Sequence, residues 1–252
     1  MSKAVLNDQG LGTLVVMPTY QEAQNIRTTL EALLRVCPEV HVLVVDDGSP
    51  DGTGRIADAM ALEDARVSVL HRDVRQGLGP AYVAGFRWAL ERGYGRICEM
   101  DMDGSHRPQD MARVLQYAEG HPEFDLVIGS RRVPGGSTRN WPWYRDLISR
   151  LGSWYAGMAL GMPVRDMTAG LRAYRAEALG KIDLDRLHSS GYVFQIDMLR
   201  RIVAGGGRVH EVPIIFVERI RGRSKMDTGI VLEAVVQVTR WGWGRLLGRP
   251  IR

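Results

Sequence analysis

The chain has 252 residues, 45% of them hydrophobic and 25% charged, which is typical of a globular protein with a sizeable core. It contains no run of about 18 consecutive apolar residues and its N-terminus is polar, so we expect neither a membrane-spanning helix nor a signal peptide. The formal net charge of +4 permits nucleic acid, a membrane surface or a phosphorylated small molecule as a partner.

Strands and helices are predicted to alternate through the first half of the chain. Short apolar runs predict the strands, and segments with helical spacing of apolar residues predict the helices between them. The predicted strands are 12–17, 40–45, 66–70, 97–100 and 124–129, and the predicted helices are a first one ending near residue 35, then 54–62, 77–92 and 109–119. This alternation predicts a doubly wound, mostly parallel α/β sheet with helices on both faces.

Polar segments follow four of the predicted strands. They are Pro18–Glu22, Asp46–Thr53, the pair Asp101 and Asp103, and Ser130–Arg132. Because the carboxyl ends of parallel strands meet at one edge of such a sheet, these segments should lie together. We therefore predict a ligand site at this edge.

The two carboxylates of Asp101-Met-Asp103 suggest a metal site. Residues i and i+2 of an extended chain point to the same side, so both carboxylates could face one ion. Hard oxygen ligands with no cysteine nearby suit Mg²⁺ or Mn²⁺, which also take ligands from a substrate phosphate. An isolated pair could equally form an acidic turn before the next helix, but its place among the other polar segments favours the metal site.

The second half of the chain differs in character. Helices are predicted at about 143–161, 192–204 and 228–247, and a strand at 208–217. Arg145 and Ser149 are four residues apart and share one face of the first of these helices.

Seven sequence blocks between residues 15 and 238 together resemble the inverting GT-A glycosyltransferases, and among them the polyprenol (dolichol) phosphate mannose synthases. The blocks are residues 18–22, 45–53, 101–106, 129–131, 166–174, 191–195 and 216–226. The resemblance implies a single GT-A catalytic domain over 1–252. Its nucleotide-binding half would be about 11–131 and its acceptor-side half about 132–227, followed by an amphipathic C-terminal helix and tail at about 228–252.

The resemblance also implies an activity: inverting transfer of mannose from GDP-mannose to a polyprenyl phosphate, with Mg²⁺ or Mn²⁺ as cofactor. The donor site would be formed by Pro18, Tyr20, Glu22, Val44, Asp46 and Met102. The metal would be held by Asp101 and Asp103. The catalytic groups would be Asp103, Arg131, Arg219 and Lys225, with the three cations near the donor's phosphates or sugar. The acceptor phosphate would be bound by Arg145 and Ser149. Ser105 departs from the family, which often has an amide there, so a third metal ligand stays open.

Several residues near these blocks have a simpler structural interpretation. Arg165 and Asp166 could form a local ion pair, and Asp47 and Asp51 could serve only to fix a loop. His106 is expected at the start of a helix, supporting the site. Surface positions are expected for Arg132, Arg139 and Arg150.

A polyprenyl acceptor would place the enzyme at a membrane. Trp241 and Trp243 alternate with arginines, and both this tail and Trp141–Tyr144 suit a headgroup boundary, although the tail could instead pack on the domain. The solitary Cys37 and Cys98 are expected to be reduced core residues of a cytoplasmic protein. We expect peripheral association with the cytoplasmic membrane face, directly or through a membrane-protein partner, and no nucleic-acid ligand.

Three other functions remain as alternatives. A polyprenyl-phosphate glucose synthase would use UDP-glucose on the same scaffold. A haloacid-dehalogenase-like phosphatase is suggested by Asp101-Met-Asp-Gly-Ser, but that family places its motif early in the domain. A non-catalytic binding module is disfavoured by the intact carboxylate pair.

Overall fold

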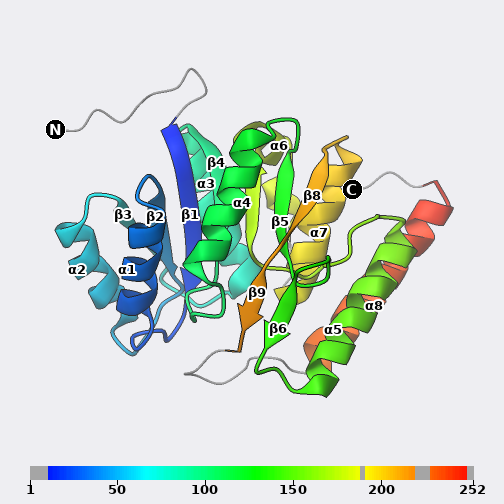
Figure 1. Ribbon diagram of the computed structural model, residues 1–252, viewed down its shortest axis with the longest axis horizontal. Helices are drawn as coiled ribbons and strands as arrows, with labels where there is room; N and C mark the ends of the chain where they lie inside the picture. Colours follow the sequence, from blue (N-terminus) through cyan, green and yellow to red (C-terminus); the bar gives the residue numbers. More distant parts are fainter. Residues whose placement is uncertain (1–10, 188–190, 219–227, 249–252) are drawn as a thin grey trace.

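The computed structural model describes residues 11–187, 191–218 and 228–248. A seven-stranded sheet forms its centre (Figure 1). The strand order is β3 (Val67–His71), β2 (His41–Asp46), β1 (Leu11–Thr19), β4 (Tyr94–Glu99), β7 (Arg172–Arg175), β5 (Leu126–Ser130) and β8 (Val209–Pro213). Neighbouring strands are parallel except for β7, which is antiparallel to both β4 and β5. The mostly parallel sheet predicted from the sequence is thus confirmed.

Helices cover both faces of this sheet. One face carries α1 (Ile26–Val36), α2 (Thr53–Glu63) and α4 (Pro108–Gly120); the other carries α3 (Leu78–Glu91), α6 (Ala176–Gly180) and α7 (Gly191–Ala204). A short 3₁₀ helix, η1 (Leu184–Arg186), lies between α6 and α7. Leu14 and Val16 of β1 enter one core while Val15 and Met17 enter the other, all fully buried. Burial on both faces explains why β1 reads as a continuous apolar run rather than an alternating one.

Two long helices lie side by side at one end of the molecule (Figure 1): α5 (Trp143–Leu160) and α8 (Thr228–Leu246). In α5 only Ser153, Ala156 and Leu160 are buried. Val238 of α8 joins the core, and Trp241 packs against it while partly buried. Among the described helices, none is long and apolar enough to cross a bilayer.

The fold departs from the predicted elements in several places. The strand predicted at 208–217 is divided into β8 and β9 (Ile215–Val217), because β9 leaves the main sheet and pairs with β6 (Ser137–Arg139). The strands β6 and β7 and the short helices α6 and η1 were not predicted. Cys37 and Cys98 are buried and free, as expected, and burial raises the pKa of the Cys98 thiol to about 12.

Candidate active site

Asp101 and Asp103 follow directly after β4, at the carboxyl edge of the sheet. Met102 between them is only 2% exposed, whereas both carboxylates are partly exposed, as the predicted alternation requires. Thr29 Oγ1 donates a hydrogen bond to the Met102 carbonyl at 3.0 Å, and the Ser105 amide donates to Asp103 Oδ1 at 3.0 Å. The turn is therefore anchored to α1, and the side chain of Met102 lies in the core.

This carboxylate pair fits a divalent cation that is shared with a substrate. Within the described parts of the chain, no group of three His, Cys, Asp or Glu side chains could enclose a metal ion. Two accessible carboxylates are instead an incomplete oxygen set, which suits Mg²⁺ or Mn²⁺ completed by waters and phosphate oxygens. The hydroxyl of Ser105 is buried beside the turn without a hydrogen-bond partner among the described residues.

His106 supports this turn by accepting a hydrogen bond from its backbone. Its ring is buried, and the Asp101 amide donates to His106 Nδ1 at 3.3 Å. Burial lowers the pKa of His106 from 6.5 to about 4, so the ring is neutral near pH 7 and carries its proton on Nε2. The 3.6 Å approach of Nδ1 to Asp101 Oδ2 is consequently not an ion pair.

Replacing His106 with asparagine is expected to reduce the loss of unfolding free energy that occurs as the pH falls. The unfolded chain takes up this proton near pH 6.5 and the folded protein only near pH 4, so acidification through this window favours unfolding. The contribution of His106 to this loss of unfolding free energy reaches about 3 kcal/mol at the lower end of the pH window. Urea unfolding at about pH 7 and pH 4.5 measures it. Asp166, whose pKa is lowered from 3.8, contributes mainly below this window. Equal pH slopes for wild type and variant would contradict the assignment.

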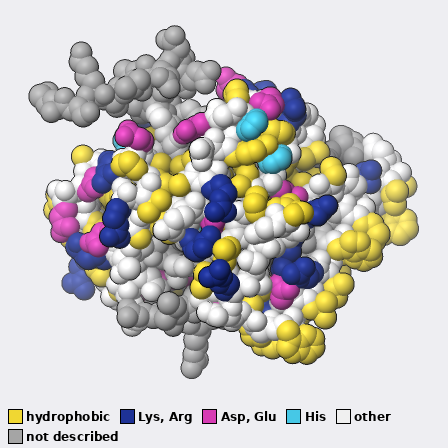
Figure 2. Space-filling view, viewed as in Figure 1, with side chains coloured by type: hydrophobic (Ala, Val, Ile, Leu, Met, Phe, Trp, Pro, Cys, Tyr) yellow, Lys and Arg dark blue, Asp and Glu magenta, His cyan; other side chains and the backbone are white. Residues whose placement is uncertain are grey.

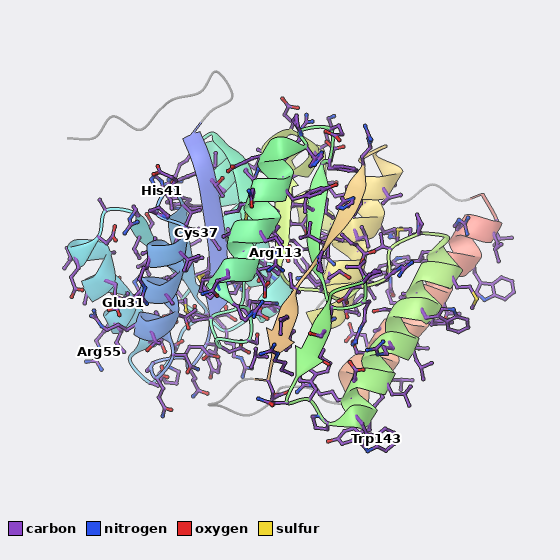
Figure 3. All side chains as sticks on the ribbon, viewed as in Figure 1. Glu31, Cys37, His41, Arg55, Arg113 and Trp143 are labelled. Atoms are coloured by element: carbon purple, nitrogen blue, oxygen red, sulfur yellow. The ribbon has the colours of Figure 1, made fainter. Side chains whose placement is uncertain are left out.

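The loop after β2 borders a cavity of about 240 Å³. The cavity is lined by Asp46, Ser49, Pro50, Gly52, Gly54, Arg55, Asp58 and His71. The backbone approaches Asp46 closely here, since a Cβ on Gly54 would lie 2.7 Å from Asp46 Oδ2. His71 Nε2 lies 2.8 Å from Asp58 Oδ1, and this hydrogen bond raises the pKa of His71. Arg55 extends outward from α2 (Figure 3). Asp46 is the predicted donor-site residue that borders this cavity.

The other acidic residues of the loop fix its shape. Asp47 accepts hydrogen bonds from Arg72 and from the amides of Gln76 and Gly77. Asp51 accepts from the Ala23 amide and from Thr53. Both side chains therefore fix the loop, as the structural interpretation expected.

The remaining predicted donor-site residues divide into two groups. Pro18, Tyr20 and Glu22 are partly exposed where β1 ends, and the guanidinium of Arg75 lies 4.1 Å from the centre of the Tyr20 ring. Val44, by contrast, is fully buried within β2. Arg219 and Lys225 lie outside the described residues.

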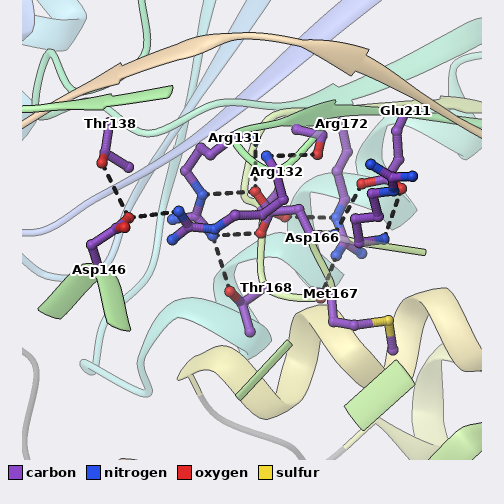
Figure 4. A network of polar contacts seen from close by, with 12 residues as sticks. Arg131, Arg132, Thr138, Asp146, Asp166, Met167, Thr168, Arg172 and Glu211 are labelled. Carbon is purple, nitrogen blue, oxygen red and sulfur yellow. Dashed lines mark hydrogen bonds and ion pairs between the residues drawn. The ribbon is translucent and has the colours of Figure 1, made fainter. Parts of the chain in front are cut away.

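Arg131 is held by a buried ion pair with Asp166 (Figure 4). Asp166 accepts from the amide, Nε and an Nη of Arg131 at 2.8, 2.8 and 2.6 Å. Although burial opposes ionisation, Arg131 and Arg132 keep the pKa of Asp166 below its ordinary value. The amides of Arg165 and Asp166 both donate to Glu211. The predicted local pair of Arg165 with Asp166 is therefore wrong, because Asp166 faces Arg131 instead.

Arg132 was expected at the surface, and this expectation is also wrong. Its side chain is 5% exposed and pairs with Asp146 in the first turn of α5, at 2.5 Å (Figure 4). Thr138 and Arg150 also donate to Asp146. These bonds overcome partial burial and lower the pKa of Asp146 to about 2. Arg139 and Arg150 are exposed, as predicted.

A second cavity, of about 80 Å³, lies between α5 and α8. Arg145 and Ser149 both line it, together with Arg131, Trp141, Ile148, Gly152, Tyr155, Ala156, Thr168, Ile196, Ala234, Val235 and Val238. Three buried atoms in this wall lack a hydrogen-bond partner within the described chain: Trp141 Nε1, Arg145 Nε and Ser149 Oγ. Unused donors beside an apolar wall suit an anionic group that carries an apolar tail.

The sequence interpretation missed a buried polar network behind the carboxylate pair. Glu99 is fully buried and accepts from Tyr174 at 2.8 Å and from Gln195 at 2.6 Å. Burial raises the pKa of Glu99. Tyr174 and Gln195 stand in the blocks at 166–174 and 191–195, which carried the resemblance without assigning either residue a role.

Arg172 orders the loop that faces Asp101. Its guanidinium is fully buried and donates to three backbone carbonyls, those of Met167, Ala169 and Gln195. Gly170 in this loop lies against the turn at Asp101–Asp103, since a Cβ there would be 3.7 Å from Asp101 Oδ2. The available signal for this role was a charged residue between the apolar neighbours Leu171 and Ala173.

Comparison with known proteins places this arrangement in a family. Residues 14–183 match the family described as Glycosyl transferase family 2. The chain is 56% identical to an undecaprenyl-phosphate mannosyltransferase of Micrococcus luteus, over 91% of this chain and 93% of the relative. It is 51% identical to a polyprenol monophosphomannose synthase of Mycolicibacterium smegmatis, over 91% and 86%.

Solved structures share the fold at lower identity. Mannosyl-3-phosphoglycerate synthase from Rubrobacter xylanophilus superposes with a TM-score of 0.68 at 21% identity, over 94% of this chain and 75% of that one. Glucosyl-3-phosphoglycerate synthase from Mycobacterium tuberculosis, in complex with Mn²⁺, UDP-glucose and phosphoglyceric acid, gives a TM-score of 0.67 at 18% identity, over 95% and 80%. The chain therefore has the GT-A fold and belongs to glycosyl transferase family 2, in the group that contains the polyprenol phosphate mannose synthases.

Proposed function

We propose that this glycosyltransferase transfers mannose from GDP-mannose to a polyprenyl phosphate, with inversion at the anomeric carbon. The observation that carries the proposal is the cavity between α5 and α8. Arg131, Arg145 and Ser149 provide its cationic and hydroxyl end, and Ile148, Val235 and Val238 its apolar wall. This combination matches a phosphate on a hydrocarbon chain. The names of the two relatives above half identity support the same acceptor class.

In this proposal the donor binds across the carboxyl edge of the sheet. Asp46 would contact the base, and Asp101 and Asp103 would hold Mg²⁺ or Mn²⁺. The ion, when bound, would stabilise negative charge on the departing diphosphate. The loop ordered by Arg172 fixes the far side of Asp101, so the carboxylate needs little reorganisation when the donor binds.

The acceptor needs little activation. A phosphate monoester is already anionic at pH 7, with a second pKa of about 6, so its oxygen can attack without a dedicated general base. The harder task is to hold two anionic groups close together. The buried pair of Arg131 with Asp166 would fix one cation, and Arg145 with Ser149 would bind the acceptor phosphate.

We further infer that the protein contacts a membrane through α5 and α8. Seven apolar side chains of α5 are 43–77% exposed at helical spacing: Trp143, Tyr144, Leu147, Ile148, Leu151, Trp154 and Met158. Exposed apolar side chains of α8 include Leu232, Val235, Val236, Trp243 and Leu246, and Leu247 is exposed just after the helix. Figure 2 shows apolar side chains gathered over this end of the molecule, and Trp143 points away from the body in Figure 3. Of the two tail tryptophans only Trp243 is exposed, because Trp241 packs inward beneath Arg200.

The double substitution Leu151→Gln and Trp154→Gln is expected to reduce flotation with anionic liposomes about tenfold or more. Each apolar side chain that enters the bilayer interface contributes roughly 1–2 kcal/mol, so two of them dominate a weak attachment. Leu62→Gln is the matched control, since Leu62 is 91% exposed on the distant helix α2. Equal flotation of the double variant and wild type would contradict this surface.

Transfer of radiolabel from GDP-mannose to a short polyprenyl phosphate, with Mg²⁺ or Mn²⁺, tests the proposed activity. UDP-glucose is the parallel donor. Organic-phase label from GDP-mannose alone is expected. Label from UDP-glucose instead would keep the acceptor but replace the donor, and no label from either would refute the proposal.

A further inference from the structure

We propose that Glu218 is an internal counter-ion that occupies Arg145 until the acceptor phosphate displaces it. Glu218 would thus set the affinity and the charge selectivity of the acceptor site. This inference depends on the proposed function for the assignment of Arg145 and Ser149 to the acceptor phosphate.

The ion pair is close but uses little of the guanidinium. One nitrogen, Nη1 of Arg145, donates to both oxygens of Glu218, at 2.8 and 2.6 Å. A two-nitrogen fork would be the stronger arrangement for an arginine and a carboxylate. Nε of Arg145 is buried and has no hydrogen-bond partner among the described residues. Glu218 therefore neutralises the charge of Arg145 but leaves its buried Nε without a hydrogen-bond acceptor among the described residues.

The unused donors lie around Arg145. Ser149 Oγ and Trp141 Nε1 line the same cavity, and both are buried without a partner in the described parts of the chain. The Arg145 guanidinium carbon is 4.5 Å from the centre of the Trp141 ring, so these two side chains are adjacent, and Ser149 lies one helical turn from Arg145 in α5. A phosphate monoester presents three strongly accepting oxygens, where a carboxylate presents two. The donor set thus matches the incoming phosphate better than it matches Glu218.

Glu218 and the acceptor phosphate are both negatively charged, so they exclude each other from Arg145. Both side chains are largely shielded from solvent, at 12% exposure for Arg145 and 22% for Glu218, so repulsion between a second anion and Glu218 is poorly screened. The Glu218 main chain is fixed, because its amide donates to the Arg139 carbonyl at 3.0 Å. Exchange therefore requires only rotation of the carboxylate side chain. A dianionic phosphate can compete with it, whereas a neutral prenol cannot.

The two roles that Glu218 could have predict opposite changes in acceptor affinity when its charge is removed. If Glu218 is a competing counter-ion, removing its charge strengthens phosphate binding. If it instead positions Arg145 for the acceptor, removing its charge weakens binding. The acceptor affinity of Glu218→Gln decides between them.

Calorimetric titration with citronellyl phosphate, a short isoprenyl phosphate, tests this in the absence of donor. We expect Glu218→Gln to bind about tenfold more tightly than wild type, and Arg145→Gln to lose binding. Glu63→Gln is the matched control, because it removes a carboxylate from the surface pair with Arg27 and should bind as wild type does. In transfer assays the acceptor KM of Glu218→Gln should fall while the donor KM stays unchanged.

Unchanged or weaker binding by a folded Glu218→Gln would overturn the counter-ion role. Glu218→Thr removes the same charge with a smaller side chain and provides a second test with the same expected sign. If wild type binds and Arg145→Gln does not, yet neither Glu218 variant binds more tightly, only this inference fails. If wild type itself does not bind citronellyl phosphate, the acceptor assignment of the proposed function fails with it.

Discussion

Replacing Asp103 with asparagine is expected to lower mannosyl transfer by about three orders of magnitude at fixed Mn²⁺. The substitution preserves the size of the side chain and the hydrogen bond that the Ser105 amide makes to it, because an amide oxygen also accepts. It removes one of two negative charges available to the cation. The fold should therefore persist while the metal affinity falls. Radiolabel transfer across a Mn²⁺ titration measures both the rate and the metal dependence.

Asp185→Asn is the control for this experiment. Asp185 is exposed and pairs with Arg87 on the surface, so losing its charge should change neither transfer nor metal dependence. Retention of more than a tenth of wild-type activity by Asp103→Asn, at every Mn²⁺ concentration, would remove Asp103 from the proposed metal site.

Asp166→Ala is expected to lower the free energy of unfolding by about 3–5 kcal/mol, the range for breaking a buried ion pair from one side. Three donors of Arg131 would lose their acceptor in a buried environment. Asp166→Asn should cost less, because its amide oxygen can still accept. Since Arg131 also lines the cavity between α5 and α8, transfer should fall with stability. Urea unfolding and the transfer assay check the two effects.

The comparison for this variant is Asp64→Ala. Asp64 pairs with Arg66 where both side chains are about a third exposed, 32% and 34%, so its loss should change stability by no more than about 1 kcal/mol. Similar losses for the Asp64 and Asp166 variants would show that burial does not control the contribution of the Arg131 pair.

The strands of the first half were predictable because each is apolar and ends in a polar segment. β1 and β2 are buried on both faces, so apolar content alone marks them. The outward orientation of Asp101 and Asp103 was predictable for a related reason: Met102 enters the core and turns its two neighbours outward. The pairing of Arg145 and Ser149 in one cavity followed from helical spacing.

Partners that are distant in sequence could not be predicted in this way. β7 contains two arginines in four residues and reads as polar, yet Arg172 is fully buried because backbone carbonyls surround its guanidinium. Asp166 was assigned to its sequence neighbour, whereas the fold brings Arg131 to it across 35 positions. Glu218 gave no local sign that it would meet Arg145.

The place of β7 in the sheet has a consequence for biosynthesis. β4 and β5 do not touch each other as neighbouring strands; each pairs with β7, which the ribosome makes more than 40 residues after β5. A nascent chain that ends before residue 172 would therefore carry two unpaired strand edges in the middle of its future sheet. High contact order of this kind slows folding and leaves open edges exposed to intermolecular pairing. We expect the centre of the sheet to form only after β7 has been made and can pair with both strands.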